Sequence, residues 1–277
     1  MRIAYLGPPG TFSEEAVSRC DLAGEDEPVP YPTFADAYHA VLRGEADAAL
    51  LPIENSIEGA VGANLDLLVH EPGPRIRREV LLPVRQHLLA RPGTRVEDVR
   101  RVISHPQPIG QCSRFLRERL AGVTLEPAHS TSDAAQRAAA AAPGTAAIGS
   151  RAAAARYGLA VIAEGIHDVE ENVTRFVLVA REDEAPTGKD RTSIAFTLDR
   201  DRPGGLYDVL GEFARWSINL SKIESRPMKQ ALGHYIFFID FERHRTEPQA
   251  AAALAGVQAR VERLHVLGSY PQAQPPG

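Results

Sequence analysis

A hydroxyl and a guanidinium stand side by side at the start of an apolar segment, in the stretch EENVTRFVLVA from residue 170 to 180. Thr174 and Arg175 come directly before the run Phe176–Val179, which is typical of a buried strand. A threonine hydroxyl can donate a hydrogen bond, and a guanidinium can bind a carboxylate through two parallel hydrogen bonds. These two residues therefore either close a loop or face a small anionic ligand.

Five further turns have the composition of ligand-binding loops. Each follows an apolar segment that predicts a strand and precedes a segment that predicts a helix, with Gly, Ser, Thr or Asn between them. They are GPPGTFSEEA after residues 2–6, PIENSIEGAVG after 46–51, SHPQPIGQC after 99–103, HSTSDAAQ after 125–128 and GSRAAAARYGL after 145–148. In the first turn, Thr11 and Glu14 have the spacing of a capping box.

The alternation of strands and helices up to about residue 180 predicts an α/β layer structure. In open α/β sheets, ligands bind beyond the carboxyl ends of the strands, where helix N-termini present free N–H groups and a positive dipole end. One such turn alone is most simply an ordinary helix cap. Several of them meeting in one cleft predict an anion site lined by hydroxyls and amides.

A change of composition separates a second domain from the first. Residues 183–191 are charged, contain Pro and Gly and have no apolar period, so we interpret them as a linker. The patterns beyond this linker predict the order strand, helix, strand, strand, helix, strand, which is the ferredoxin-like unit. Residues 269–277, SYPQAQPPG, are predicted to be a disordered tail.

Composition argues against several classes of function. The 277 residues are 44% hydrophobic and 24% charged, as in an ordinary globular protein. A net charge of -5 with scattered Lys and Arg argues against nucleic acid as a partner. The two cysteines, Cys20 and Cys112, make no disulfide framework and no zinc spacing. Since no phosphate-binding loop, dinucleotide fingerprint or hydrolase elbow is present, we expect no cofactor and no metal.

Export and membrane insertion are not expected either. The N-terminus, MRIAYLGPPG, predicts a short strand ended by a turn, unlike a signal peptide. No apolar run reaches the roughly 18 to 20 residues of a membrane helix. We therefore expect a cytoplasmic protein without membrane contact.

Six motifs together are similar to those of the prephenate dehydratases, the enzymes that make phenylpyruvate for phenylalanine biosynthesis. They are GPPGTFSEEA, PIENSIEGAVG, SHPQPIGQC, NVTRF, GGLYDVLGEF and INLSKIESRP, in family order over about residues 1–268. The resemblance implies a catalytic part with two lobes, like a periplasmic binding protein, followed by an ACT regulatory domain. It also implies the monofunctional type, because the chain starts at the dehydratase strand without a helical chorismate mutase segment.

The resemblance also implies the domain boundaries. It places the catalytic domain at residues 1–182, with a first lobe of about 1–78 plus 172–182, a second lobe of about 79–171, and the ACT domain at 192–268. ACT domains pair side by side and bind an amino acid, so a homodimer or homotetramer with phenylalanine as effector is implied.

The chemistry implied by the resemblance needs little from the protein. Loss of carbon dioxide and a hydroxyl makes the ring of prephenate aromatic, so the enzyme only binds two carboxylates and donates a proton to the departing hydroxide. By analogy with the family, Thr174 is that donor. Arg175 is either a carboxylate clamp, which we favour, or a brace paired with an acid such as Glu54. Phe176 either contacts the ring or packs in the core, and Glu54 is either catalytic or orients Asn55.

The remaining expected site residues lie in the same motifs. For substrate binding they are Thr11, Phe12, Ser13, Ser56, Ser104, Gln107 and Gln111. For phenylalanine they are Gly204, Gly205, Leu206, Tyr207, Asn219, Leu220, Glu224, Ser225, Arg226 and Pro227, with Gly205 where alanine is usual. A second glycine makes this helix start more flexible.

Three other functions stay open on the sequence alone. Arogenate dehydratase uses the same chemistry on a substrate with an amine in place of the keto group. A solute-binding protein shares the two-lobed architecture, although the fused ACT domain and the missing export signal argue against it. A non-catalytic amino-acid sensor is the third, and the intact TRF motif argues against it.

Overall fold

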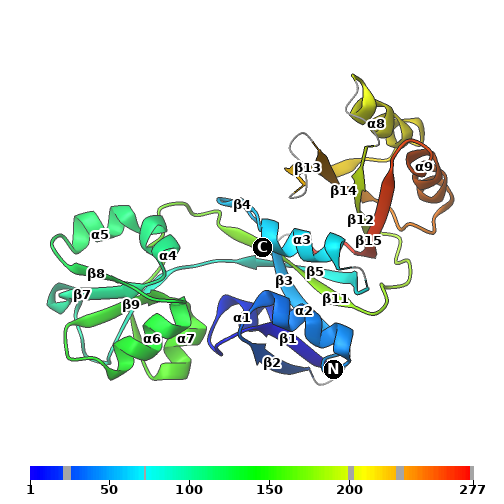
Figure 1. The fold of residues 1–277 in the computed structure, drawn as a ribbon. Helices are drawn as coiled ribbons and strands as arrows, with labels where there is room; N and C mark the ends of the chain where they lie inside the picture. The colour runs from blue at the N-terminus through cyan, green and yellow to red at the C-terminus, as the bar shows by residue number, and fades with distance from the viewer. Residues whose placement is uncertain (21–25, 72, 199–202, 229–233, 275–277) are drawn as a thin grey trace.

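The computed structural model describes residues 1–20, 26–71, 73–198, 203–228 and 234–274. The chain forms two α/β lobes and a C-terminal domain beside the first lobe (Figure 1), each with its own sheet. No described helix is long and apolar enough to cross a membrane. The predicted two-lobed α/β architecture is confirmed.

The first lobe is built around a mixed sheet. Its elements are β1 (Arg2–Leu6), α1 (Phe12–Val17), β2 (Glu27–Tyr31), α2 (Phe34–Arg43), β3 (Ala48–Asn55), β4 (Gly59–Ala60), α3 (Gly62–His70), β5 (Arg75–Pro83) and β11 (Val173–Ala180). The strand order is β2-β1-β3-β11-β5, with β1 parallel to β2 and β3, and β11 antiparallel to β3 and β5. Residues 48–53 of β3 are buried, as expected of a strand covered on both faces.

The second lobe repeats this plan. Its elements are β6 (His87–Ala90), the 3-10 helix η1 (Val96–Asp98), β7 (Arg101–Ser104), α4 (Pro106–Gln111), α5 (Ser113–Arg119), β8 (Thr124–Pro127), α6 (Thr131–Ala140), β9 (Thr145–Gly149), α7 (Arg151–Tyr157) and β10 (Ala160–Ala163). The strand order is β10-β6-β9-β7-β8. Ser130 and Ser150 cap α6 and α7 through their hydroxyls, as their positions before a helical segment predict.

The chain leaves the first lobe at the end of β5 and returns to it as β11. These two strands pair along their length, and the pairing continues to Pro83 opposite Val173. The predicted lobe boundary at residue 78 is therefore wrong: residues 79–83 belong to the first lobe, because they continue its hydrogen-bond ladder.

The C-terminal domain has the predicted ferredoxin-like order. Its elements are β12 (Asp190–Thr197), α8 (Gly205–Arg215), β13 (Leu220–Pro227), β14 (Tyr235–Glu242), α9 (Pro248–Gln258) and β15 (Arg263–Pro271). The strand order is β13-β14-β12-β15. Leu206, Val209 and Phe213 of α8 pack with Ile194 and Phe241 of the sheet.

The ends of this domain differ from prediction. The linker is shorter than 183–191, because Asp190 already pairs in β12 with Pro271 of β15. The predicted tail 269–277 is wrong at its start: Ser269 and Tyr270 are buried in β15, and this strand continues to Pro271. Residues 275–277 of the predicted tail lie outside the described residues.

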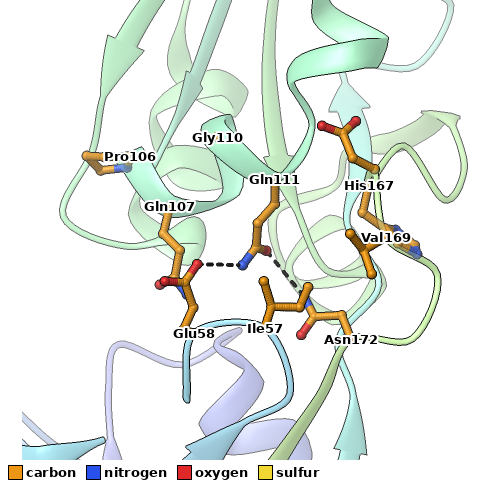
Figure 2. A pocket seen from close by; sticks show the side chains of 10 residues that line it. Ile57, Glu58, Pro106, Gln107, Gly110, Gln111, His167, Val169 and Asn172 are labelled. Atoms are coloured by element: carbon orange, nitrogen blue, oxygen red, sulfur yellow. Dashed lines mark hydrogen bonds between the residues drawn. The ribbon is translucent and has the colours of Figure 1, made fainter. Parts of the chain in front are cut away.

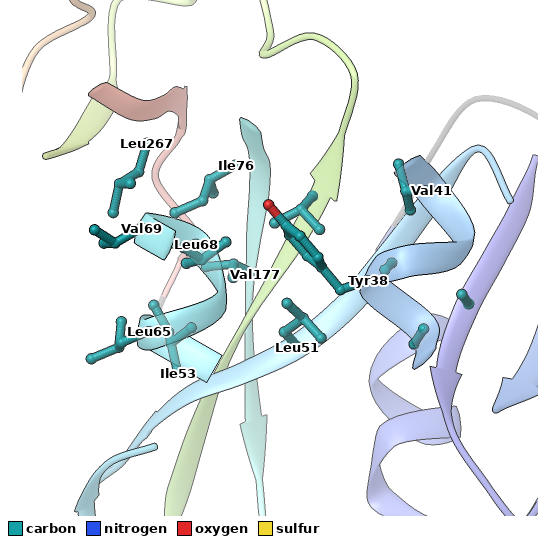
Figure 3. Packing of buried hydrophobic residues seen from close by; sticks show 14 of the residues in the cluster. Tyr38, Val41, Leu51, Ile53, Leu65, Leu68, Val69, Ile76, Val177 and Leu267 are labelled. Atoms are coloured by element: carbon teal, nitrogen blue, oxygen red, sulfur yellow. The ribbon is translucent and has the colours of Figure 1, made fainter. Parts of the chain in front are cut away.

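One hydrophobic core joins the first lobe to the C-terminal domain. Figure 3 shows Tyr38, Leu51, Val69 and Ile76 of the lobe packed in the same cluster as Leu267 of β15. Burying a Leu or Ile side chain stabilises a fold by about 1.5–3 kcal/mol. The C-terminal domain is therefore fixed on the lobe by packing as well as by the linker.

Gly268 allows this close approach of β15 to β5. A Cβ atom at Gly268 would overlap the backbone of Ile76, and its φ of 153° is a conformation that L side chains rarely adopt. Glycine is thus required at this contact.

Candidate active site

A cleft of about 250 Å³ is lined by residues of both lobes. Its walls are the end of β3, the start of β11, the hinge segment that follows β5 (residues 84–86), and the starts of α1, α4 and α6. It is lined by Thr11, Phe12, Ser13, Asn55, Val84, Gln86, His105, Gln107, Pro108, Gln111, His129, Ser130, Thr131, Asn172 and Thr174. The predicted convergence of polar turns is confirmed for four turns. The fifth is different, because Ser150 and Arg151 line a separate pocket.

Thr174 and Asn55 are joined by a hydrogen bond inside the cleft. They are directly opposite each other on β11 and β3, and Asn55 Nδ2 lies 2.9 Å from Thr174 Oγ1. Two backbone hydrogen bonds fix the orientation of the Asn55 amide: its Oδ1 accepts the N–H groups of Ile57 and Glu58 at 3.0 Å each. The Thr174 hydroxyl accepts from Asn55 and donates to no acceptor among the described residues, so its proton can be donated into the cleft that it lines.

Arg175 points to the other face of the sheet, because successive side chains of a strand alternate. It is 7% exposed. Its Nε donates to Glu79 at 2.7 Å, its Nη1 to Asp240 at 2.6 Å and its Nη2 to the Tyr270 hydroxyl at 2.8 Å. The structure contradicts the favoured prediction of a carboxylate clamp. It agrees with the alternative of a brace, although Glu54, at 3.6 Å, is a more distant partner than Glu79 and Asp240.

The pKa of Asp240 should make this brace resistant to acid. Burial by itself raises that pKa, but the charge of Arg175 and the hydrogen bond from Ser193 outweigh it and hold the pKa below the ordinary 3.8. A depressed carboxyl pKa stabilises the fold above pH 3.8, and this stabilisation is lost as pH falls through the lower folded-state value.

Substituting Asp240→Asn is thus expected to destabilise the chain by a constant amount from pH 5 to 8, and by progressively less below pH 3.8. Urea unfolding of both proteins across this range measures the difference. A difference that does not shrink in acid would show that the Asp240 charge is not what stabilises the brace.

Glu54 and Phe176 also lie outside the cleft. Glu54 Oε2 lies 3.1 Å from Lys222 Nζ of the C-terminal domain, so its carboxylate turns away from the ligand side. Phe176 is buried in the first lobe among residues such as Val80 and Leu178. The structure therefore supports the core alternative for Phe176 and gives Glu54 no direct contact with a ligand in the cleft.

Two predicted substrate contacts are contradicted. Ser104 is fully buried, and its hydroxyl donates to the Ile148 carbonyl at 2.9 Å. The Ser56 hydroxyl donates to the Glu171 carbonyl at 2.9 Å and accepts the Val173 N–H at 3.0 Å. Both hydroxyls satisfy backbone groups, so they fix loops next to the cleft instead of lining it.

Gln111 connects the two lobes through hydrogen bonds to Glu58 and Asn172 (Figure 2). Its Oε1 accepts from Asn172 Nδ2 at 3.3 Å, and its Nε2 donates to Glu58 Oε1 at 3.4 Å. An outer pocket of about 550 Å³ shares Gln107, Gln111 and Asn172 with the cleft. The predicted residues that do line the cleft are Thr11, Phe12, Ser13, Asn55, Gln107, Gln111 and Thr174.

Several cleft residues were missed by sequence reasoning. Ser130 and Thr131 begin α6 in a turn that the sequence had singled out, and Asn172 stands two residues before Thr174, so their signal was present. Gln86 has no such signal, because it lies in the hinge segment between β5 and β6 and belongs to no polar turn. It is 2% exposed, and its Oε1 has no hydrogen-bond partner within the described part of the chain.

The predicted phenylalanine-site residues lie at the start of α8 and along β13. Gly204, with φ 82°, precedes α8, and Tyr207 in its first turn is 77% exposed. On β13, Lys222, Glu224 and Arg226 are partly buried, and the residues between them are exposed. The other predicted positions are Gly205, Leu206, Asn219, Leu220, Ser225 and Pro227; Asn219 donates to Glu242 at 3.0 Å.

Comparison with known proteins decides the family. The family model described as prephenate dehydratase matches residues 3–184, and the ACT domain model matches residues 192–258. The chain belongs to the prephenate dehydratase family. A prephenate dehydratase of Amycolatopsis methanolica is 44% identical over 276 residues, which are 98% of this chain and 89% of that protein.

Solved structures agree with this membership of the prephenate dehydratase family. The prephenate dehydratase of Arthrobacter aurescens in complex with L-Phe is 40% identical, with a TM-score of 0.89 over 100% of this chain and 92% of that one. GqqA, described as a novel type of quorum quenching acylase, is 30% identical, with a TM-score of 0.86 over 99% of this chain and 98% of its own. Proteins with this fold therefore carry more than one described activity, and the residues of the cleft determine the reaction.

Proposed function

We propose that the chain converts prephenate to phenylpyruvate, carbon dioxide and water, with Thr174 as hydrogen-bond donor to the departing hydroxyl. The bond to the ring carboxylate breaks, and its electron pair enters the ring. The carbon–oxygen bond opposite breaks, and the hydroxyl leaves with its electron pair and gains a proton. The observation that supports this role is the Asn55 to Thr174 hydrogen bond, which leaves the Thr174 proton free for the ligand. Membership of the family supports the substrate.

Two features of the cleft suit a substrate that already carries two negative charges. The described lining residues include no Lys or Arg, so the carboxylates would be bound by uncharged donors. α6, capped by Ser130, begins at the cleft with Thr131, and a helix N-terminus presents free N–H groups and about half a positive charge. The Gln107 and Gln111 amides add side-chain donors.

Prephenate and arogenate are distinguished by turnover. The purified wild-type chain is supplied with each substrate in parallel, and kcat/KM is measured for both. We expect the larger kcat/KM for prephenate. An equal or larger value for arogenate would assign the chain to arogenate dehydration, and binding of either compound without turnover would favour a solute-binding protein or sensor.

Gln86 is expected to contribute to binding. An unpaired buried acceptor costs about 1–3 kcal/mol, so a ligand donor such as the substrate hydroxyl would be stabilised by pairing with it. Substituting Gln86→Met should raise KM for prephenate about tenfold, or about 1.4 kcal/mol, and should not lower the Tm of the free chain. Steady-state kinetics and thermal denaturation measure the two effects. An unchanged KM would exclude Gln86 from the binding set.

The C-terminal domain is proposed to bind phenylalanine and to pair with a second copy along β13. β13 is at one end of the sheet order, and an edge strand presents unpaired N–H and C=O groups. Large apolar side chains on the same domain are exposed: Tyr207, Trp216, Ile223 and Tyr235. The Arthrobacter aurescens relative crystallised with L-Phe supports phenylalanine as effector.

Substituting Ile223→Asp should reduce the dimer to monomers and weaken phenylalanine binding at least tenfold. Ile223 is exposed on β13 in the single chain, so in a dimer that pairs along β13 the carboxylate introduced by this substitution would be buried without a cationic partner, which is costly. Sedimentation and isothermal titration measure the two effects. Unchanged phenylalanine binding by a monomeric variant would contradict a shared site, and absence of binding by the wild type would exclude phenylalanine as effector.

A further inference from the structure

Two pairs of opposite charge face each other between the catalytic lobe and the ACT domain. Arg175 and Glu54 are register partners on β11 and β3. Asp240 and Lys222 are register partners on β14 and β13. The cation of each pair meets the anion of the other: Arg175 Nη1 lies 2.6 Å from Asp240, and Lys222 Nζ lies 3.1 Å from Glu54.

Three of these four side chains are largely buried, and the group is joined to further carboxylates, because Arg175 also pairs with Glu79 and Lys222 with Glu224. The Arg175, Asp240 and Lys222 side chains are 9%, 6% and 10% exposed, and Glu54 is the most open at 40%. Ser193 of β12 donates to Asp240 at 2.5 Å, which fixes the carboxylate from the ACT side. A buried charge that loses its partner is strongly destabilised, so the two sheets are held in one relative position.

The next residue along each strand of the lobe is in the active site. Asn55 follows Glu54, and Thr174 precedes Arg175, so strand alternation places one pair toward the ACT domain and the other toward the cleft. A shift of Glu54 or Arg175 along its strand moves the Asn55 to Thr174 hydrogen bond with it, because backbone and side chains of a strand move together.

Lys222 also connects these two charge pairs to Glu224, one of the residues predicted to bind phenylalanine. Its Nζ lies 3.3 Å from Glu224 and 3.1 Å from Glu54, yet it is buried without a partner in hydrogen-bond geometry among the described residues. The ammonium is thus shared between one carboxylate of the lobe and one in the predicted phenylalanine motif. A change in the position or charge environment of Glu224 alters how strongly Lys222 attracts Glu54.

We propose that Lys222 and Asp240 of the ACT domain are positioning residues for the active site, acting through Glu54 and Arg175 on the Asn55 to Thr174 hydrogen bond, and that phenylalanine regulates turnover through the Lys222 to Glu54 contact. The proposal rests on the proposed function and goes beyond it. Neither Lys222 nor Asp240 lines the cleft. Lys222 contacts Glu54, which precedes Asn55 on β3, and Asp240 contacts Arg175, which follows Thr174 on β11.

The test is a double-mutant cycle on Lys222 and Glu54 with prephenate turnover as readout. The full-length wild type, Lys222→Met, Glu54→Gln and the double variant are assayed for kcat and KM, each with and without saturating phenylalanine. We expect each single variant to lower kcat about three- to tenfold with KM within twofold of wild type. The factor by which phenylalanine inhibits should fall about tenfold, within the usual range of allosteric coupling. The double variant should be no worse than either single variant.

Two controls separate positioning from general damage. Lys222→Arg keeps the charge and should retain most of the phenylalanine response. Arg260→Met removes a pair, at 2.8 Å, between the residue two positions after α9 and Glu212 of α8, and should leave turnover and inhibition unchanged. Thermal denaturation of every variant shows whether a loss of activity follows a loss of folded protein.

The outcomes are distinct. Single variants that keep the wild-type kcat and phenylalanine response overturn the proposal while leaving the proposed function intact. Losses that add in the double variant, or that follow the Tm in all variants including Arg260→Met, overturn it as well. A wild type without turnover of prephenate overturns the proposed function and this inference together.

Discussion

Replacing Thr174 by alanine is expected to lower kcat for prephenate about 10²- to 10⁴-fold, the usual contribution of a positioned proton or hydrogen-bond donor. The reason is geometric. The Thr174 oxygen accepts from Asn55 Nδ2 and lies on the wall of the cleft, so the hydroxyl proton can be donated to a ligand there. KM should change much less, because the hydrogen bond strengthens only as negative charge develops on the departing oxygen. Steady-state formation of phenylpyruvate measures both constants.

The matched control is Thr174→Ser, which keeps the hydroxyl and loses only a methyl group. We expect it to retain kcat to within about tenfold of wild type, because the donor group is preserved. If the alanine variant also stays within tenfold of wild type, Thr174 is not the donor, whatever the identity of the enzyme.

Replacing Arg175 by methionine is expected to lower the free energy of unfolding by about 3–5 kcal/mol, the cost of leaving a buried charge without its partner. Glu79 and Asp240 are almost fully buried, and both lose a hydrogen bond from Arg175 of 2.7 Å or less. Glu79 keeps Arg191 at 2.6 Å, whereas Asp240 keeps only its uncharged partner Ser193 among the hydrogen bonds of its side chain that the structure describes. Urea unfolding at neutral pH measures the loss.

Arg151→Met is the control for an exposed ion pair. Arg151 lies 2.6 Å from Glu164, but both side chains are more than half exposed, so its loss should cost less than about 1 kcal/mol. A carboxylate clamp would give the reverse result for Arg175→Met: KM for prephenate would rise strongly while the free energy of unfolding stayed near that of wild type. That outcome would contradict the brace.

The position of Thr174 in the cleft was predictable from the sequence, and the position of Arg175 was predictable in principle. A polar pair before an apolar run suggested that both side chains face the same ligand. Neighbouring residues of a strand point to opposite faces, however, so only one of them can line the cleft. What the sequence could not supply was the partner of Arg175, because Glu79 and Asp240 lie 96 and 65 residues away along the chain.

The same limit applies to the serines and to Gln86. Ser56 and Ser104 have the residue type of a ligand contact, but their hydroxyls satisfy backbone carbonyls that only the folded chain brings near. Gln86 became visible only through burial and an unpartnered oxygen, since neither its neighbours nor its spacing mark a site. The α/β layers and the ferredoxin-like order followed from local patterns and were predicted well, whereas the division into two lobes came from the resemblance to the family.

The lobe boundary near residue 78 was implied by the resemblance to the family, and the strand pairing moves it. The first-lobe sheet contains β5 through Pro83 because β11, from the end of the catalytic domain, pairs with it. The sequence around residue 78 carries no signal of this pairing, because the partner strand is about 90 residues further along the chain. Tertiary pairing also explains β15, whose buried Tyr270 accepts a hydrogen bond from Arg175, although its sequence is followed by a Pro-rich end.

Dehydration and decarboxylation of prephenate in this cleft can be measured from the products that the purified wild-type chain forms from prephenate. We predict phenylpyruvate and carbon dioxide in equal amounts, at a rate proportional to protein concentration and well above that of a blank without protein. Prephenate that is bound but remains unchanged, with no phenylpyruvate above the blank, would contradict this activity.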